Sequence, residues 1–427
     1  MSADIHSTID ALWKMEAGQV IGGLTRIVRD VGLAEDLAQE ALLAALQQWP
    51  QSGIPPNPGA WLMTTAKRRA IDYFRHQSMS AVKNEELART LATLEQTTPD
   101  LAGHLGDPIR DDLLRLIFIS CHPVLPRESR AALTLRAVGG LTTSEIARSF
   151  LAAEPTIAQR IVRAKRTLGE AKIPFEVPRG ADLAARLGSV LEVVYLIFNE
   201  GYSATAGEDL IRGELCDEAL RLGRILAELE PAEAEVHGLV ALMEIQSSRA
   251  RARVGASGQP ILLLDQNRAL WDRLLIGRGF AALERAQKLN APSGPYRLQA
   301  EIAACHARAV TAAETDWRRI LSLYRELAAI MPSPVVELNR AVAVGMAEGP
   351  EAALKLLEPL CNDPLMKNYH LLPSVRGDML ARLGRHAEAA AEFERAAGMT
   401  RNTREQRLLT ERARASTQAA HPSVPSS

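Results

Sequence analysis

Apolar residues return every three or four positions along most of the chain, which predicts amphipathic helices. The first such stretch runs from about Ile9 to Gln48, and a second runs from Ala60 to about His76. Between them, residues 51–59 contain three prolines and two glycines. We predict a loop there, because proline lacks the amide hydrogen that a helix interior needs. A second helical module is expected over 111–172.

The remaining segments divide the chain further. Residues 78–110 end in turn-forming residues and predict a linker, and residues 173–180 predict a hinge between domains. From 181 to about 415, helix follows helix with short turns. Near the end, the turn residues Gly349 and Gly384 lie 35 positions apart, close to the tetratricopeptide (TPR) period of about 34 residues. Leu380, Ala389, Phe393 and Ala396 fit the TPR spacing, whereas 181–300 fits it poorly. Residues 416–427 predict a disordered tail.

Composition supports an all-α fold, because the chain is 47% hydrophobic but only 4% aromatic, and Ala, Leu, Arg and Glu dominate. The net charge of -1 gives no argument for nucleic acid. We find neither a signal peptide nor an apolar run long enough to span a membrane, so we expect a soluble, cytoplasmic protein. The four scattered cysteines indicate reduced, buried thiols rather than a metal site. No cofactor is expected.

The helix over residues 33–49 has one buried and one polar face. Leu37, Ala41, Ala45 and Trp49 repeat every four residues on the apolar face. The polar stripe carries Asp36, Glu40 and Leu43, with Gln39 at its edge. This stripe is either a solvated acidic surface or a docking face for a basic partner, with Leu43 as its apolar contact.

The helix after the proline loop combines cations with aromatic rings. It carries Lys67, Arg68, Arg69 and Arg75 against one acid, Asp72, and interleaves Trp61, Tyr73 and Phe74 with them. Cations that hold phosphates and rings that stack on unpaired bases are typical of single-strand nucleic-acid binding. The alternative is a core helix with buried rings and solvated cations. The loop before it would shape a pocket for an extruded base.

Residues 139–172 predict a helix-turn-helix. Thr142 and Glu145 have the spacing of a capping box that starts a short helix. The second helix places Ile157, Ile161, Ala164 and Leu168 inward. From Thr156 to Lys172 it has five basic residues against one acid. Either this is an ordinary amphipathic pair, or its outer face reads base edges and grips phosphates.

These three helices, in this order, resemble an extracytoplasmic-function (ECF) sigma factor of the sigma-70 family. "AEDLAQEALLAAL" is similar to its region 2.2, "WLMTTAKRRAIDYFR" to regions 2.3 and 2.4, and "LTTSEIARSF…TIAQRIVRAKRTL" to region 4.2. "IFNEGYSAT" and "MPSPVVELNRAVAVG" resemble a subgroup with a large TPR-like C-terminal extension. The resemblance implies region 2 over 1–77, a linker over 78–110, region 4 over 111–172, a regulatory domain over 181–415 and the tail over 416–427.

The resemblance also implies partners and roles. The partners would be core RNA polymerase, through its β′ clamp and β flap, and promoter DNA, with a protein or peptide on the TPR-like surface. Polymerase contacts would come from Asp36, Gln39, Glu40 and Leu43. The -10 element would be bound by Asn57, Trp61, Lys67, Arg68, Arg69, Asp72, Tyr73 and Arg75. The -35 element would be bound by Thr156, Gln159, Arg160, Arg163, Lys165 and Arg166.

Two other functions explain the sequence less fully. A one-component regulator, with a helix-turn-helix joined to a sensor domain, accounts for 111–427 but leaves the acidic helix and the basic-aromatic helix without a role. An enzyme in the C-terminal half would need a catalytic motif, and we find no phosphate loop, GxSxG or HExxH there. We therefore expect a sigma factor with no enzymatic activity.

Overall fold

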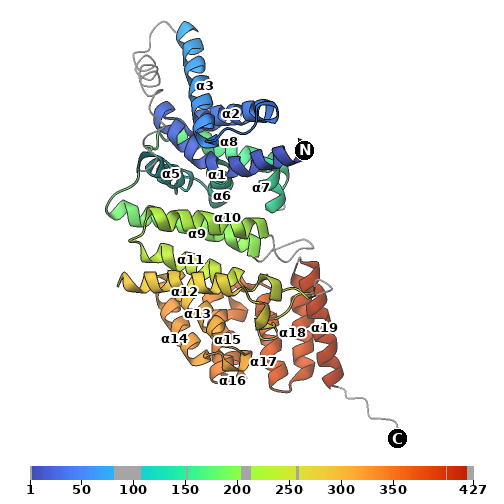
Figure 1. The fold of residues 1–427 in the computed structure, drawn as a ribbon. Helices are drawn as coiled ribbons and strands as arrows, with labels where there is room; N and C mark the ends of the chain where they lie inside the picture. Colours follow the sequence, from blue (N-terminus) through green and yellow to red (C-terminus); the bar gives the residue numbers. More distant parts are fainter. Residues whose placement is uncertain are drawn as a thin grey trace. The chain divides into compact units, whose positions relative to one another are not determined.

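The protein is helical throughout the part that the computed structural model describes, as the periodicity predicts (Figure 1). These described residues are 2–80, 107–150, 152–202, 213–255, 259–400 and 402–420. Outside the helices, Val254 and Pro260 form an isolated antiparallel bridge. The chain divides into two compact units, Met1–Ile197 and Phe198–Ser427, which we describe separately.

Three helices form the start of the first unit: α1 (Ser2–Val28), α2 (Val31–Ser52) and α3 (Pro58–Ser80). α1 packs against both of the others. Burial of Leu37, Ala41, Ala45 and Trp49 confirms the predicted apolar face of α2. The ring of Trp61 lies edge-on against Trp49, with centroids 5.2 Å apart, so the start of α3 is fixed against the end of α2.

The loop between α2 and α3 is shorter than the prolines predict. α2 continues through Pro50 to Ser52, and the proline removes the one backbone hydrogen bond that its missing N–H would donate. α3 begins at Pro58 rather than Ala60. The Asn57 side chain accepts a hydrogen bond from the Ala60 amide at 3.0 Å and so caps the helix. α3 continues to Ser80, and most of the predicted linker, residues 81–106, lies outside the described residues.

The second module of the first unit contains α5 (Asp107–Ser120), α6 (Arg127–Ala137), α7 (Thr143–Ser149) and α8 (Glu154–Glu170). Its α5 packs directly on α1. Gly22 permits this approach, because a Cβ there would lie 2.8 Å from the Asp112 carbonyl oxygen. The two predicted modules are therefore in close contact in this structure.

The predicted hinge is an irregular segment, but the helix after it belongs partly to the first unit. The division at Ile197 falls inside α9 (Ala181–Tyr202). Arg186 donates to the Phe118 carbonyl at 2.8 Å, and Ser189 donates to the Cys121 carbonyl at 2.6 Å. These contacts attach the first part of α9 to α5 and the residue that follows it.

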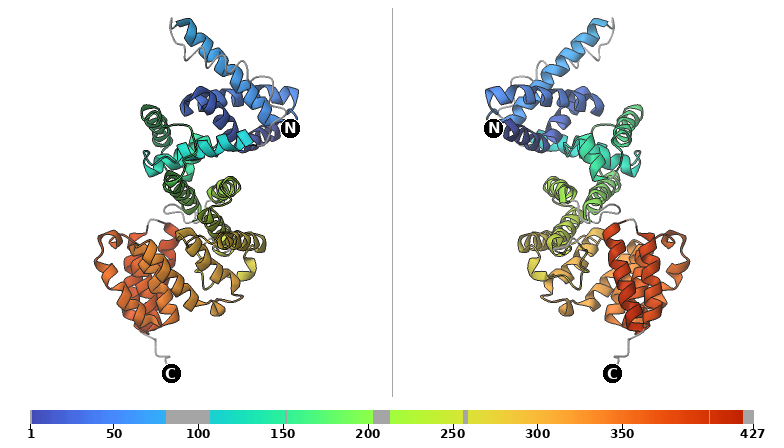
Figure 2. Two further views of the ribbon diagram at one scale, coloured as in Figure 1. Left: turned by 90° about the vertical axis from the view of Figure 1, so that its left-hand side faces the viewer. Right: turned by 90° about the vertical axis from the view of Figure 1, so that its right-hand side faces the viewer.

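The second unit is a series of packed helices, and its last two, α18 and α19, lie side by side in the right-hand view of Figure 2. Short 3₁₀ turns interrupt the series. Its helices after α9 are α10 (Gly213–Leu229), α11 (Ala234–Ser247), α12 (Arg273–Lys288), α13 (Pro295–Arg308), α14 (Trp317–Ile330), α15 (Pro334–Ala347), α16 (Pro350–Leu357), α17 (Leu371–Arg382), α18 (His386–Met399) and α19 (Thr403–Ala420).

The α17–α18 pair has the predicted TPR-like packing. Leu380, Ala389, Phe393 and Ala396 belong to one buried cluster, and Gly384 makes the turn with φ at 75°. The structure differs from the prediction at the chain end, where α19 includes Ser416–Ala420. Buried Leu409, Ala413 and Ser416 continue one helical stripe, so packing orders a polar sequence that by itself indicates disorder. Residues 421–427 lie outside the described residues.

Candidate functional site

The polar stripe of α2 lies on the surface as a connected acidic face with an apolar member. The side chains of Asp36 and Glu40 are 72% and 53% exposed, and Leu43 is 58% exposed. Gln39 is half-buried at the edge of the stripe. A large exposed leucine beside two carboxylates fits a docking surface for a basic, partly apolar partner.

The exposed face of α3 carries cations and one ring. Arg68, Arg69, Asp72, Tyr73 and Arg75 are all exposed. Trp61 is half-buried against Trp49, so its ring is part of the packing as well as of the surface. Arg69 lies 3.7 Å from Glu40 across the α2–α3 contact. Because both side chains are half exposed, this pair contributes little stability.

Lys67 differs from its neighbours, since its side chain points inward and only 6% of it is exposed. Burial, together with nearby Arg26, lowers the pKa of the Lys67 ammonium below its ordinary value. In this structure Lys67 therefore does not belong to the cationic surface of Arg68 and Arg69. Of the three neighbouring cations expected on the surface, Arg68 and Arg69 are exposed and Lys67 is not.

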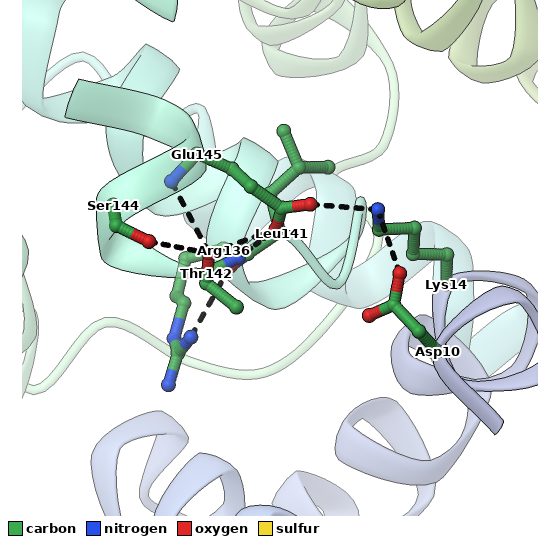
Figure 3. A network of polar contacts seen from close by, with 7 residues as sticks. All are labelled: Asp10, Lys14, Arg136, Leu141, Thr142, Ser144 and Glu145. Atoms are coloured by element: carbon green, nitrogen blue, oxygen red, sulfur yellow. Dashed lines mark hydrogen bonds and ion pairs between the residues drawn. The ribbon is translucent and has the colours of Figure 1, made fainter. Parts of the chain in front are cut away.

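A capping box begins α7, as the sequence predicts (Figure 3). The Thr142 amide donates to Glu145 Oε2 at 2.7 Å, and the Glu145 amide donates to Thr142 Oγ1 at 3.2 Å. Glu145 also accepts a hydrogen bond from Lys14 Nζ of α1 at 2.8 Å, and Lys14 lies 3.0 Å from Asp10. Burial alone would raise the pKa of Glu145, but these hydrogen bonds outweigh it and hold the pKa below its ordinary value.

The inner face of α8 is the predicted one, because Ile157, Ile161, Ala164 and Leu168 are all buried. The outer face presents exposed Thr156, Gln159, Arg163 and Arg166, with Arg160 half-buried beside them. Arg166 lies 3.5 Å from Glu170 one turn later, with both side chains 70% exposed. This surface is polar at the start of the helix and cationic further along, which suits entry into a DNA groove.

Lys165 lies off that outer face and is engaged within the protein. Its ammonium bonds to Glu35 of α2 and lies 3.3 Å from Asp36. Glu35 is 3% exposed and also accepts a hydrogen bond from Arg136 Nε of α6 at 2.8 Å. A buried carboxylate thus joins two cations of the second module to the helix that carries the acidic stripe.

This ionic group is not apparent from the sequence. Glu35 and Arg136 are 101 positions apart, and Glu35 and Lys165 are 130 apart, so no local spacing connects them. The same applies to Arg26 and the buried Asp112, which pair at 3.0 Å between α1 and α5. One signal was present, since Glu35 is a charged residue on the otherwise apolar, buried side of α2.

Within the described ranges, no group of three or more His, Cys, Asp or Glu side chains is placed to hold a metal ion. No described helix combines the length and the apolar character needed to cross a bilayer.

Comparison with known families matches three parts of the chain. The family model for sigma-70 region 2 matches residues 12–79, and that for sigma-70 region 4 matches residues 115–168. A family of unknown function, DUF6596, matches residues 186–287. The region 2 match includes the acidic helix α2 and the basic-aromatic helix α3. The alternative function, a one-component regulator, gives these two helices no role.

Similar proteins support the same assignment. The chain is 46% identical over 389 residues to uncharacterized protein R00370 of Rhizobium meliloti (strain 1021), covering 91% of this chain and 90% of that one. It is 27% identical over 175 residues to the probable ECF RNA polymerase sigma factor SigI of Mycobacterium tuberculosis (strain ATCC 25618 / H37Rv), covering 40% of this chain and 58% of that one.

A third relative, the ECF RNA polymerase sigma factor SigK of Mycolicibacterium vanbaalenii (strain DSM 7251 / JCM 13017 / BCRC 16820 / KCTC 9966 / NRRL B-24157 / PYR-1), is 27% identical over 155 residues, covering 35% of this chain and 74% of that one. No solved structure matches the chain. The sigma-70 region 2 and region 4 matches occur in the family's order, and they contain the helices with the exposed acidic stripe, the cationic-aromatic face and the capped helix-turn-helix. The chain is therefore a member of the sigma-70 family, of its ECF type, with a long helical C-terminal extension.

Proposed function

We propose that this sigma factor binds core RNA polymerase through α2, the promoter -10 element through α3 and the -35 element through α8, under control of its fused C-terminal unit. The observation that carries the proposal is the presence of three separate exposed faces with the required chemistry on one unit. They are the acidic stripe with Leu43, the cationic-aromatic face of α3 and the polar-to-cationic face of α8.

Polymerase docking would use Asp36, Gln39, Glu40 and Leu43. Exposed carboxylates steer a basic partner into place, and burial of the leucine side chain on docking adds apolar area. Two of these residues already contact cations of this chain, since Glu40 lies near Arg69 and Asp36 lies near Lys165. Docking therefore exchanges internal ion pairs for intermolecular ones.

Capture of melted DNA would use Arg68, Arg69, Asp72, Tyr73 and Arg75 on α3, with Asn57 and Trp61 at its start. Unstacking bases costs energy, which stacking on a ring and phosphate contacts with guanidinium groups offset. Lys67 would pack on the inner side of α3 and make no contact with DNA, because it is buried.

Duplex recognition would use Thr156, Gln159, Arg160, Arg163 and Arg166 on α8. Lys165 could join them only after leaving Glu35 and Asp36. We infer that the described arrangement is a closed form. In it Lys165, a proposed -35 contact, pairs with Asp36, a proposed polymerase contact, so neither is available to its partner. Binding to polymerase and DNA would then require the two modules to separate.

The test is transcription by purified core polymerase from promoters of the source genome, with and without this protein. We expect promoter-specific transcripts that depend on the full chain. Asp36→Lys combined with Glu40→Lys should abolish co-purification with polymerase, whereas Glu411→Lys, an exposed acid on α19, should leave it unchanged. Arg160→Ala should reduce protection of the -35 region but retain polymerase binding. A chain that joins no polymerase under any condition would refute the proposal.

A further inference from the structure

A cavity of about 330 Å³ lies inside the C-terminal unit, between segments that are far apart in the sequence. One wall comes from Arg249, Arg253 and residues between 260 and 266, all after α11, and the other from α17 and α19. Its lining combines three arginines, Arg249, Arg253 and Arg412, with aliphatic side chains that include Ile261, Leu263 and Leu408. The volume is within the range of about 300–1,000 Å³ typical of small-molecule sites.

Two of the arginines are held in place around one tyrosine. Arg253 lies over the Tyr202 ring with its guanidinium carbon 3.9 Å from the centroid, and it donates to the Tyr202 carbonyl oxygen. Arg249 donates to the Tyr202 hydroxyl at 2.6 Å. Arg249 Nε is buried and has no hydrogen-bond partner among the described residues. These contacts preorganise two guanidinium groups and leave one N–H donor unsatisfied.

The cavity concentrates positive charge at an electrostatic cost. Burial first, and Arg249 second, lower the pKa of the Arg253 guanidinium below its ordinary value. The third arginine, Arg412, bonds to Asp378, which does not line the cavity. Glu405 is the carboxylate among the lining residues, and it already accepts hydrogen bonds from His370 at 3.2 Å and Thr400 at 2.9 Å. Among the lining residues, three arginines therefore accompany one carboxylate that has its own partners, and one of the three, Arg412, is paired with Asp378 outside the lining.

From this arrangement we propose that the cavity binds an organic carboxylate with an apolar body. The guanidinium groups offer the planar donor pattern that a carboxylate accepts, and the aliphatic lining favours a hydrocarbon body over a bare inorganic anion. Such a ligand would contact Arg249, residues 260–263 and α19 together, and so join two segments of the unit that are far apart in the sequence. This inference does not depend on the sigma function, because binding alone tests it.

The test is calorimetric titration of the full chain with 4-phenylbutyrate and its neutral counterpart, 4-phenyl-1-butanol. Leu371 is at the cavity wall and 41% exposed, so Leu371→Glu adds a negative charge there with little effect on folding. Leu365→Glu is the matched control, because Leu365 is 78% exposed and outside the cavity. Arg249→Gln removes the donor group directly. Inorganic phosphate tests for a general anion site.

We expect the carboxylate to bind at least about tenfold more tightly than the alcohol, as charge-assisted recognition requires. Leu371→Glu and Arg249→Gln should each weaken carboxylate binding by about tenfold or more, and Leu365→Glu should not. Equal binding of acid and alcohol, an unchanged affinity in Leu371→Glu, tighter binding of phosphate than of the carboxylate, or no binding of the carboxylate would each overturn the proposal.

Discussion

His306, on α13, is a residue whose burial makes the stability of the second unit depend on pH. Burial first, then Arg249 and Arg268, lower its pKa from 6.5 to about 3. Above pH 6.5 the imidazole is neutral in both folded and unfolded chains, so it has no effect. Below that pH the unfolded chain takes up a proton that the folded chain rejects. Folding stability therefore falls between pH 6.5 and about 3.

At pH 5 this loss amounts to about 2 kcal/mol, at 1.36 kcal/mol per pKa unit. His306→Phe keeps a ring against Trp317, which lies 5.2 Å away edge-on, but removes the titration. Hydrogen exchange of the α13 amides at pH 7 and pH 5 gives the opening free energy at each pH. We expect it to fall more steeply in the native chain than in His306→Phe, and equal slopes would refute the burial argument.

Neighbouring cations on α3 should behave differently in DNA binding. Arg68 is exposed, whereas Lys67 is buried. In the polymerase complex, Arg68→Met should lower the slope of log affinity for promoter DNA against log salt by about one, the loss of one phosphate contact. Lys67→Met should leave the slope unchanged. The measurement is the affinity for promoter DNA at several salt concentrations. A change of slope in Lys67→Met would mean that Lys67 does contact a DNA phosphate.

Single residues also mark the limit of what the sequence predicts at this scale. The exposure of Asp36, Glu40 and Leu43 follows from helical periodicity and is as predicted. The inward direction of Lys67 does not follow, because it depends on which neighbouring helix covers that side of α3. A run of three basic residues always wraps around a helix, so at least one can face the core.

At the scale of helices, the start of α3 depends on Asn57. Its side chain caps the helix through the Ala60 amide, and the proposed function also gives it a contact with DNA. Asn57→Ala should cost about 1 kcal/mol of stability through loss of the cap. Asn57→Asp should retain the cap, since aspartate caps as well as asparagine.

The two variants separate the roles of Asn57. If the residue acts only as a cap, Asn57→Asp should transcribe like the native chain. If it also contacts a base, Asn57→Asp should lose promoter opening while urea unfolding of the first unit remains as in the native chain. We expect the second result, because a carboxylate cannot donate the hydrogen bond that the Asn57 amide group would give to a base. Opening by permanganate footprinting is the measurement.

The sequence predicted a helix well where the residues that define it lie close together in the chain. α8 has the predicted buried stripe, and α7 has the predicted capping box, because each depends on residues within one or two turns. The end of α2 and the length of α19 were not predicted. In both cases the helix continues through residues that disfavour it, because buried side chains such as Trp49 and Leu409 stabilise it by packing.

At the scale of the molecule, the sequence predicts separate modules but not their contacts. The predicted boundary after 172 coincides with an irregular segment, whereas the compact unit extends to Ile197 because Arg186 and Ser189 attach α9 to α5 and the residue after it. Similarly, the sequence predicted the exposed acidic stripe of α2 and the outer face of α8, but not the ionic group that Glu35 forms between their helices. Such contacts depend on residues more than one hundred positions apart.

The buried Glu35 is suited to a closed form that opens at low cost. In the closed form its carboxylate is desolvated but satisfied by Arg136 and Lys165, whose side chains are each 18% exposed. On opening, all three charges regain water, so the loss of attraction is largely offset by hydration. Glu35→Gln changes this balance, because it leaves two nearby cations partly buried without a carboxylate. Closure should weaken by about 3 kcal/mol.

The distance between α1 and α8 reports the closed form. Spin labels at Met15→Cys and Val162→Cys, both at positions more than 60% exposed, should give one short, narrow distance distribution in the native background. Glu35→Gln should broaden and lengthen it and raise promoter-DNA affinity of the free chain, because Lys165 is released. Glu170→Gln breaks only an exposed pair with Arg166 and should change neither quantity. An unchanged distribution in Glu35→Gln would mean that other contacts of α1 hold the two modules together, namely its packing on α5, the Arg26–Asp112 pair and the Lys14–Glu145 hydrogen bond.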